Sequence, residues 1–162
     1  MNIDDLYQYY FYDIYRFLLS LSNDHHVSED LLQETFFRAY LHLENYNDEH
    51  VKTWLFTVAR NAFIDHYRKQ KRSIIKDQPF FTQYHDKDKP PLEQIMLNED
   101  VQDIKKWLEH LPERQKQAIL IRDFHDFSYQ EGAKIMNVSI ANFKVLLFRG
   151  RQAIRKRKAG DE

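Results

Sequence analysis

Apolar residues along this chain recur at intervals of three and four, which is the spacing of one face of an α-helix. Helix breakers are scarce, because the 162 residues include only 3 glycines and 4 prolines, and runs that alternate apolar with polar residues are almost absent. The pattern therefore predicts an all-α protein. A first helix is expected at residues 3–21, with its apolar positions at Leu6, Tyr9, Tyr10, Ile14, Phe17, Leu18 and Leu21.

A second helix is predicted after a break at residues 23–27. Ser28 is a suitable N-cap for it, with Glu29 and Asp30 in the first turn, where the helix dipole favours acids. Its core stripe is expected to consist of Leu31, Leu32, Thr35, Phe36, Ala39, Tyr40 and Leu43. The outward face places Phe37 and Leu41 among charged residues. Such a mixture occurs on docking surfaces and on solvated faces, and the pattern alone leaves both open.

A third helix is expected at residues 51–72, after a polar loop at 45–50. The side chains expected to pack inward are Leu55, Val58, Ala59, Ala62 and Phe63. Those left for solvent or a ligand are Trp54, Arg60, Asn61, Tyr67, Arg68, Lys69, Lys71 and Arg72. Aromatic and amide groups that lead into a basic helix end suit unpaired DNA, because bases stack on aromatic rings and cations follow the backbone. The alternative is that Trp54 anchors the core and the basic end is merely solvated.

The helical period is lost at residues 73–91, where charges are mixed and two prolines end the stretch. We expect a flexible linker there, which divides the chain into two small helical domains at 1–72 and 92–162. The first apolar positions of the second domain are Leu92, Ile95, Met96, Ile104, Trp107 and Leu108, and Pro112 is placed in the first turn of a further helix.

Residues 126–158 predict two helices joined by a short turn, a helix-turn-helix. Ser128 and Glu131 have the spacing of a capping box, and the turn is expected at residues 137–139. Ala133 occupies the position where a small residue lets the two helices cross. Gly132 lies inside the first of these helices, where glycine costs about 1 kcal/mol relative to alanine.

The second helix of this pair has two different faces at 100° per residue. The inward face holds Phe143, Leu146, Leu147, Gly150 and Ile154, and the outward face holds Ala141, Lys144, Val145, Phe148, Gln152 and Arg155. Ser139 caps the helix, so that its free N–H groups and positive dipole end suit a phosphate. Positive charge is added by Lys144, Arg149, Arg151, Arg155, Lys156, Arg157 and Lys158. This pattern favours DNA binding; the alternative is a helical hairpin on a helical core with a solvated basic end.

Composition narrows the classes of function. The formal net charge is −1, so the chain is not basic as a whole. Positive charge is concentrated in two clusters at 67–72 and 149–158, which suit two separated contacts on one long polyanion. The preference of basic residues for helix C-termini, which comes from the helix dipole, explains part of both clusters. The absence of cysteine excludes disulfides and thiol catalysis. No apolar run of 18 residues and no basic, apolar N-terminal signal is present, which predicts a cytoplasmic protein without direct membrane insertion. The 8 histidines form no HExxH motif and there is no glycine-rich phosphate loop, so we expect no enzyme, no metal and no cofactor.

Four segments in order resemble the signatures of the bacterial extracytoplasmic-function sigma factors, group IV of the sigma-70 family. They are DLLQETFFRAY at 30–40, WLFTVARNAFIDHYRKQKR at 54–72, LPERQKQAILIRDFHDFSYQEGAKIM at 111–136 and NFKVLLFRGRQAI at 142–154. The N-terminal part is similar to the sigma-M type of cell-envelope stress regulators. The resemblance implies a protein that binds RNA polymerase core, directs it to promoters and helps to open the DNA.

The resemblance also implies roles for individual residues. Docking on the clamp coiled coil of the largest polymerase subunit falls to Asp30, Gln33, Glu34, Phe37 and Arg38. Binding of the minus-10 promoter element falls to Trp54, Arg60, Asn61, Arg68 and Lys69, with Asn61 in the pocket for an unstacked base and Trp54 supporting the loop. In the minus-35 element, Lys144, Val145, Phe148 and Arg149 match the positions nearest base edges and backbone, and Ser139, Asn142 and Arg151 those nearest phosphates.

Further partners implied by the resemblance are the polymerase flap and a membrane-bound anti-sigma factor that acts as a repressor. The chain departs from the family pattern at Val145, where a hydroxyl is frequent, at Gly150, where alanine is usual, and in the loop at 45–50, which has no glycine. The alternative function is that of a stand-alone helix-turn-helix regulator, which would leave residues 30–72 unexplained.

Overall fold

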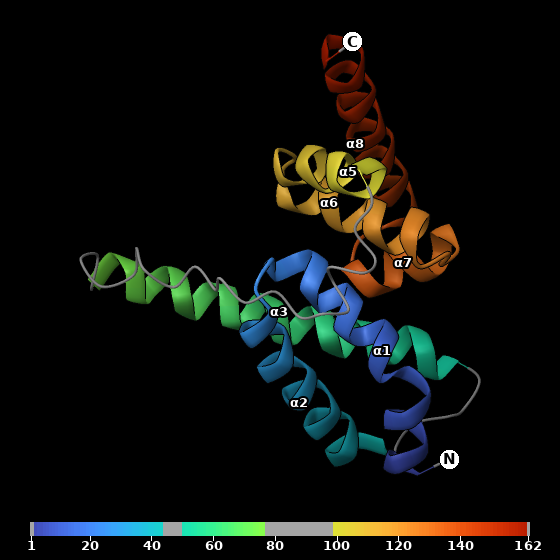
Figure 1. The fold of residues 1–162 in the computed structure, drawn as a ribbon. Coiled ribbons are helices and arrows are strands. Elements are labelled where there is room, and N and C mark those ends of the chain that lie inside the picture. The colour runs from blue at the N-terminus through green and yellow to red at the C-terminus, as the bar shows by residue number, and fades with distance from the viewer. Residues whose placement is uncertain (1, 44–49, 77–98, 162) are drawn as a thin grey trace. The chain divides into compact units, whose positions relative to one another are not determined.

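The computed structural model describes residues 2–43, 50–76 and 99–161 (Figure 1). Within these ranges all regular structure is helical, which confirms the predicted all-α class. The chain divides into two compact units, Met1–Lys89 and Pro90–Glu162. Of the predicted linker, residues 73–76 belong to a helix of the first unit, and the remainder lies outside the described residues, as do the loop at 44–49 and the predicted core positions Leu92, Ile95 and Met96.

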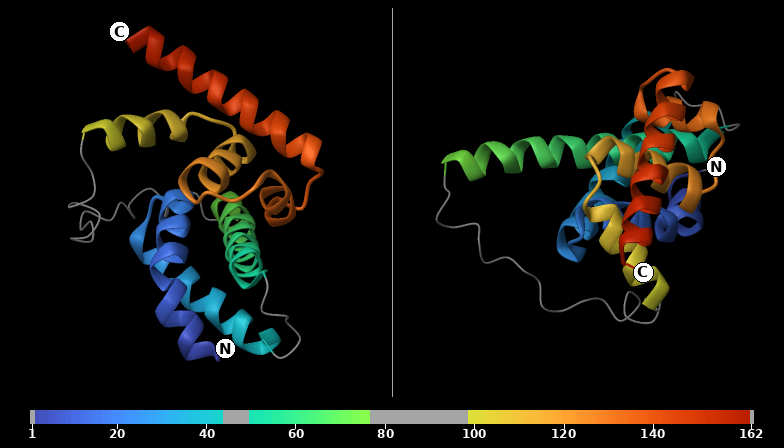
Figure 2. Two further views of the ribbon diagram at one scale, coloured as in Figure 1. Left: turned by 90° about the vertical axis from the view of Figure 1, so that its right-hand side faces the viewer. Right: turned by 90° about the horizontal axis from the view of Figure 1, so that it is seen from above.

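The first unit consists of three helices that pack against one another: α1 (Ile3–Ser22), α2 (His25–His42) and α3 (Val51–Lys76). Their core contains Leu6, Ile14, Phe17 and Leu18, all without exposed surface, and the ring of Phe17 lies 4.9 Å from that of Phe56 on α3. At 26 residues, α3 is about 39 Å long. Its C-terminal part projects beyond α1 and α2 in Figure 1 and in the right-hand view of Figure 2.

The junction between α1 and α2 differs from the sequence prediction. Asn23 ends α1 in the left-handed conformation with φ 56°, which asparagine tolerates better than most residues. Asp24 is the N-cap of α2, because its carboxylate accepts hydrogen bonds from the backbone N–H groups of His26 and Val27 at 2.9 and 3.2 Å. The prediction that Ser28 caps this helix is therefore wrong. Ser28 is buried in the second turn, where its hydroxyl donates to the Asp24 carbonyl oxygen at 2.7 Å.

Two tyrosines that the pattern counted among the apolar positions of α1 and α2 are exposed. Tyr9 is 75% exposed and Tyr40 is 61% exposed. Tyr40 lies about 40° around α2 from the buried Phe36, on the side toward Phe37, so that it falls at the edge of the apolar stripe rather than within it. The outward face of α2 therefore carries three large apolar side chains, with Tyr40 added to Phe37 and Leu41.

The second unit consists of α5 (Glu99–Glu109), α6 (Glu113–Ile119), η4 (Leu120–Phe124), α7 (Tyr129–Met136) and α8 (Ile140–Asp161). Pro112 is the N-cap of α6, one residue before the first turn in which we expected it. The segment η4 is a single π-helical turn, in which the N–H of His125 bonds to the carbonyl of Leu120 at 3.1 Å. Helix α8 packs on α5, α6 and α7, and the buried side chains of α6 and α8 include Ile119, Phe143 and Leu147.

Candidate functional site

The hairpin of α7 and α8 has the local structure that its sequence predicts. Ser128 Oγ accepts from the Glu131 N–H, and Glu131 Oε1 accepts from the Ser128 N–H, each at 3.0 Å, so the capping box is confirmed. Helix α7 ends at Asn137, which has φ 55°, and the Val138 N–H bonds back to the Ala133 carbonyl at 3.0 Å. Ser139 then caps α8 by accepting from the Asn142 N–H at 3.1 Å. The turn at 137–139 is confirmed.

Gly132 of α7 lies directly against the ring of Phe143 of α8. A Cβ atom on this residue would lie 2.7 and 2.8 Å from the Cε2 and Cε1 atoms of Phe143, a ring with no exposed surface. The glycine therefore makes room for the ring of α8 against α7. The glycine thus has a packing role beside its predicted cost in helix propensity. The sequence pattern did not reveal this role, because propensity is local whereas the contact joins residues eleven positions apart.

The two faces of α8 are as predicted. Phe143 and Leu147 are 0% and 2% exposed, whereas Val145 and Phe148 on the opposite side are 44% and 62% exposed. The outward face also exposes Ala141, Asn142, Lys144, Arg149, Gln152 and Arg155. An exposed helix face with cations beside apolar groups can enter the major groove, where cations meet phosphates or guanine and apolar groups meet thymine methyls.

Arg151 of α8 forms an ion pair with another element of the second unit. Its Nε and Nη2 atoms lie 3.1 and 2.5 Å from the two carboxylate oxygens of Asp123 in η4, a bidentate ion pair. The hydrogen bond that Arg151 donates to Asp123 raises the pKa of Arg151 above its ordinary value. The partners are 28 residues apart in the sequence, so no local pattern predicts the pair. Arg151 thus links α8 to η4, whereas the family resemblance implied a contact with phosphates.

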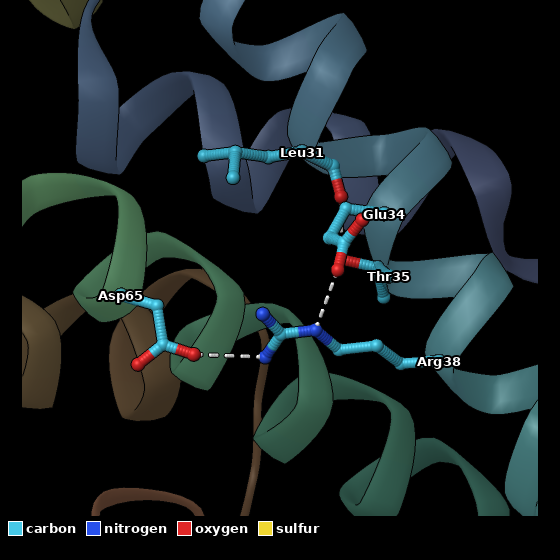
Figure 3. Close-up of polar contacts among 5 residues, drawn as sticks. All are labelled: Leu31, Glu34, Thr35, Arg38 and Asp65. Atoms are coloured by element: carbon cyan, nitrogen blue, oxygen red, sulfur yellow. Dashed lines mark hydrogen bonds and ion pairs between the residues drawn. The ribbon is translucent and has the colours of Figure 1, made fainter. Parts of the chain in front are cut away.

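The outward face of α2 carries a second, polar network (Figure 3). Arg38 donates from Nε to Glu34 Oε1 at 2.9 Å and lies with Nη1 3.1 Å from Asp65 Oδ2 on α3. The hydrogen bond to Glu34, followed by the contact with Asp65, raises the pKa of Arg38. One guanidinium therefore joins α2 to α3. The predicted docking residues Asp30, Gln33, Glu34 and Phe37 are exposed around it, with Phe37 58% exposed.

Helix α3 exposes some, but not all, of the residues that the sequence assigned to DNA. Asn61, Arg68 and Lys69 are exposed and Trp54 is half-buried. Arg60 is only 6% exposed, so the expectation that it faces solvent or a ligand is wrong. It shares one side of the helix with the buried Phe56 and Phe63, at spacings of four and three residues, and its long stem packs there. Phe56 is also buried and was not among the predicted core positions, because the buried stripe of α3 is wider than expected.

The described residues were also compared with the requirements of a metal site and of a membrane-spanning helix. Within 2–43, 50–76 and 99–161, no group of three or more histidine, aspartate or glutamate side chains is arranged to hold a metal ion. In the same part of the chain, no helix combines the length and the apolar character that crossing a bilayer requires.

Comparison with known proteins covers nearly the whole chain. Residues 6–73 match the family model described as Sigma-70 region 2, and residues 102–154 match that described as Sigma-70, region 4. The ECF RNA polymerase sigma factor SigM of Bacillus subtilis (strain 168) is 43% identical over 156 residues, which cover 96% of this chain and 94% of that protein. The ECF RNA polymerase sigma factor SigX of the same organism is 34% identical over 158 residues, 93% of this chain and 80% of that one. Among solved structures, the sigma factor RpoE from Bartonella quintana, crystallised with the anti-sigma factor NepR, superposes with a TM-score of 0.82 at 27% identity and covers 98% of both chains.

Proposed function

Since the chain belongs to the extracytoplasmic-function sigma factors of the sigma-70 family, we propose that it directs RNA polymerase core to promoters through three separate surfaces on its two units. The family assignment makes the chain a transcription initiation factor and disfavours a stand-alone regulator. The surfaces and their residues are the proposal. In this role the chain supplies no catalytic group, because RNA synthesis belongs to the core enzyme.

The outward face of α8 is proposed to bind the minus-35 element in the major groove. Lys144 and Arg149 contact base edges or backbone, and Val145 and Phe148 offer apolar contacts. Ser139 and Asn142 lie at the capped N-terminus of α8, where backbone N–H groups suit a phosphate. Arg151 contributes by holding α8 on η4 through Asp123 rather than as a free cation.

Helix α3 is proposed to follow the single strand at the minus-10 element. Its exposed Asn61 binds an unstacked base, and Arg68 and Lys69 follow the phosphates. Trp54, half-buried, supports the adjoining loop. Arg60 is buried. Its role in the proposal is therefore to help hold α3 in place, not to contact the DNA strand.

The outward face of α2 is proposed to dock on the clamp coiled coil of the largest polymerase subunit, while the second unit contacts the flap. Exposed Phe37, Tyr40 and Leu41 supply the apolar area, and Asp30, Gln33, Glu34 and Arg38 supply the polar rim. Arg38 is held in place by Glu34 and Asp65, so less conformational entropy is lost when the surface is covered.

The observation that carries the proposal is the sharp division of α8, with Phe143 fully buried and Phe148 62% exposed on a basic helix. The test is transcription of genomic DNA from the source organism by core polymerase, with and without the chain, followed by sequencing of the RNA 5′ ends. The proposal expects a discrete set of starts that requires the chain. It is refuted if the chain protects promoter DNA unaided while transcription by core does not depend on it.

We further propose cytoplasmic regulation by a membrane-bound anti-sigma factor during envelope stress. Support comes from the resemblance to SigM and from the solved structure of the similar sigma factor RpoE in complex with the anti-sigma factor NepR. The tagged chain, recovered from detergent-solubilised membranes, is expected to bring with it a protein with a membrane span that inhibits transcription. Recovery of inhibitory protein from the soluble fraction alone would refute the membrane-bound part.

A further inference from the structure

Tyr129, the first residue of α7, lies beside cations from two other elements. The Cζ atom of Arg122 in η4 is 4.8 Å from the centre of its ring, and Nζ of Lys144 in α8 is 5.4 Å from it. Both distances lie within the range of cation–π attraction, in which a cation meets the negative face of an aromatic ring. The Tyr129 ring is also 6.5 Å from that of Phe143, and the residue is 37% exposed. Tyr129 therefore touches both the buried and the exposed side of the hairpin.

The neighbours of Tyr129 are themselves held in place. Arg122 donates from Nη1 to the Phe127 carbonyl at 2.9 Å, and Arg151 is paired with Asp123. The Asp123 hydrogen bond is the main cause of the raised pKa of Arg151, and Tyr129 adds to it. Among these cations, Lys144 is the one on the face of α8 proposed to meet DNA, and the aromatic ring is its contact in the hairpin.

We propose that Tyr129 is a positioning residue for DNA binding, whose ring orders the Lys144 side chain before the promoter arrives. The inference rests on the proposed function of α8. A lysine that is free in solution loses rotamer freedom when it binds a phosphate, whereas one already held over a ring has lost part of it. The ring attracts the charge as a whole, so the three N–H donors of the ammonium remain available to DNA. Arg151 is different, since Asp123 occupies two of its N–H groups.

The test is a double-mutant cycle in the holoenzyme of core polymerase and full-length chain. The probe is a duplex promoter fragment identified by mapping the RNA starts that require the chain, and its dissociation constant is measured over a range of salt concentrations. Tyr129→Leu is expected to weaken binding about two- to fivefold, the size of an exposed cation–π contact. Tyr129→Phe keeps the ring and is expected to bind like the wild type. In a Lys144→Ala background, Tyr129→Leu is expected to have no further effect.

Three results would overturn the inference: wild-type affinity for Tyr129→Leu, equal losses for Tyr129→Leu and Tyr129→Phe, or additive losses for Tyr129→Leu and Lys144→Ala. Gln130→Ala, a change of the exposed neighbouring residue, is the matched control and is expected to bind normally. Thermal unfolding of each variant checks that α7 is intact, and Tyr129→Met replaces Tyr129→Leu if the leucine variant does not fold. Failure of the proposed function would give a different result from failure of this inference, because even the wild-type holoenzyme would then not bind the promoter fragment selectively.

Discussion

Replacing Gly132 with alanine is expected to destabilise the second unit, although the same change stabilises most helices. The gain from helix propensity is about 1 kcal/mol. The new methyl would overlap the Phe143 ring, whose Cε2 and Cε1 atoms lie 2.7 and 2.8 Å from the Cβ position, and overpacking of a core costs about 1–3 kcal/mol. Because Phe143 is fully buried, its ring cannot swing into solvent. We expect a net loss of about 1 kcal/mol of unfolding free energy from these two opposing terms.

The other two glycines serve as matched controls, because all three lie in helices of the same unit. At Gly150, a Cβ would meet the flexible end of Ile119 at 2.7 Å, so Gly150→Ala is expected to be nearly neutral. At Gly160 nothing lies within 4 Å, and Gly160→Ala is expected to stabilise slightly, since the last turn of a helix frays. The predicted order of stability is therefore Gly160→Ala, then Gly150→Ala, then Gly132→Ala.

The assay is urea unfolding followed by tryptophan fluorescence. The chain has 2 tryptophans, Trp54 in the first unit and Trp107 in the second. A Trp54→Phe background leaves Trp107 to report the second unit alone. The reasoning is refuted if Gly132→Ala is stabilised as much as or more than Gly160→Ala. A second check is the double variant Gly132→Ala/Phe143→Leu, in which the smaller side chain relieves the overlap and the two changes are expected to couple favourably by about 1 kcal/mol.

Three other predictions concern the proposed surfaces and one buried charge. Arg149→Ala or Lys144→Ala in the holoenzyme is expected to weaken promoter binding and to lower the salt slope by about one unit for each phosphate that is no longer neutralised, and an unchanged slope in both variants would contradict their placement. The double change of Glu34 and Phe37 to alanine is expected to reduce co-purification with core polymerase while the thermal midpoint stays close to wild type; normal co-purification would reject α2 as the docking face. Lys116 is 5% exposed, and burial lowers its pKa below the ordinary 10.5. The unfolded chain therefore binds more protons between the folded pKa and 10.5, so the free energy of unfolding is expected to rise with pH across that window, and Lys116→Met is expected to lack this rise in urea titrations.

Short-range signals in the sequence predict the hairpin of the second unit well. A capping box needs two residues three positions apart, and the turn needs a residue such as Asn137 that tolerates positive φ. The two faces of α8 follow from helical period alone. Ser28 does not cap the helix, because Asp24, four residues before it, accepts hydrogen bonds from two backbone N–H groups of the first turn. The prediction considered Ser28 alone and did not compare it with Asp24.

Contacts between distant segments are the part that the sequence does not predict. The pairs Arg38 with Asp65 and Arg151 with Asp123 depend on how helices are placed against one another. The same holds for Gly132, because its lack of a Cβ atom matters only through the Phe143 ring, which belongs to another helix. Arg60 is misplaced because arginine is normally exposed, although its position on α3 lies on the buried stripe.

The π turn at Leu120–Phe124 continues from α6 and carries Asp123, the partner of Arg151 in α8. Such a turn accommodates one residue more than an α-helical turn of the same rise. Deleting one residue from it would leave an ordinary α-helical turn at the end of α6 and would change the angular positions of the residues that remain in the turn. Asp123 would then no longer point at Arg151, whatever residue type stood at each position. The pair of Asp123 and Arg151 therefore depends on the length of this segment as well as on the two residue types.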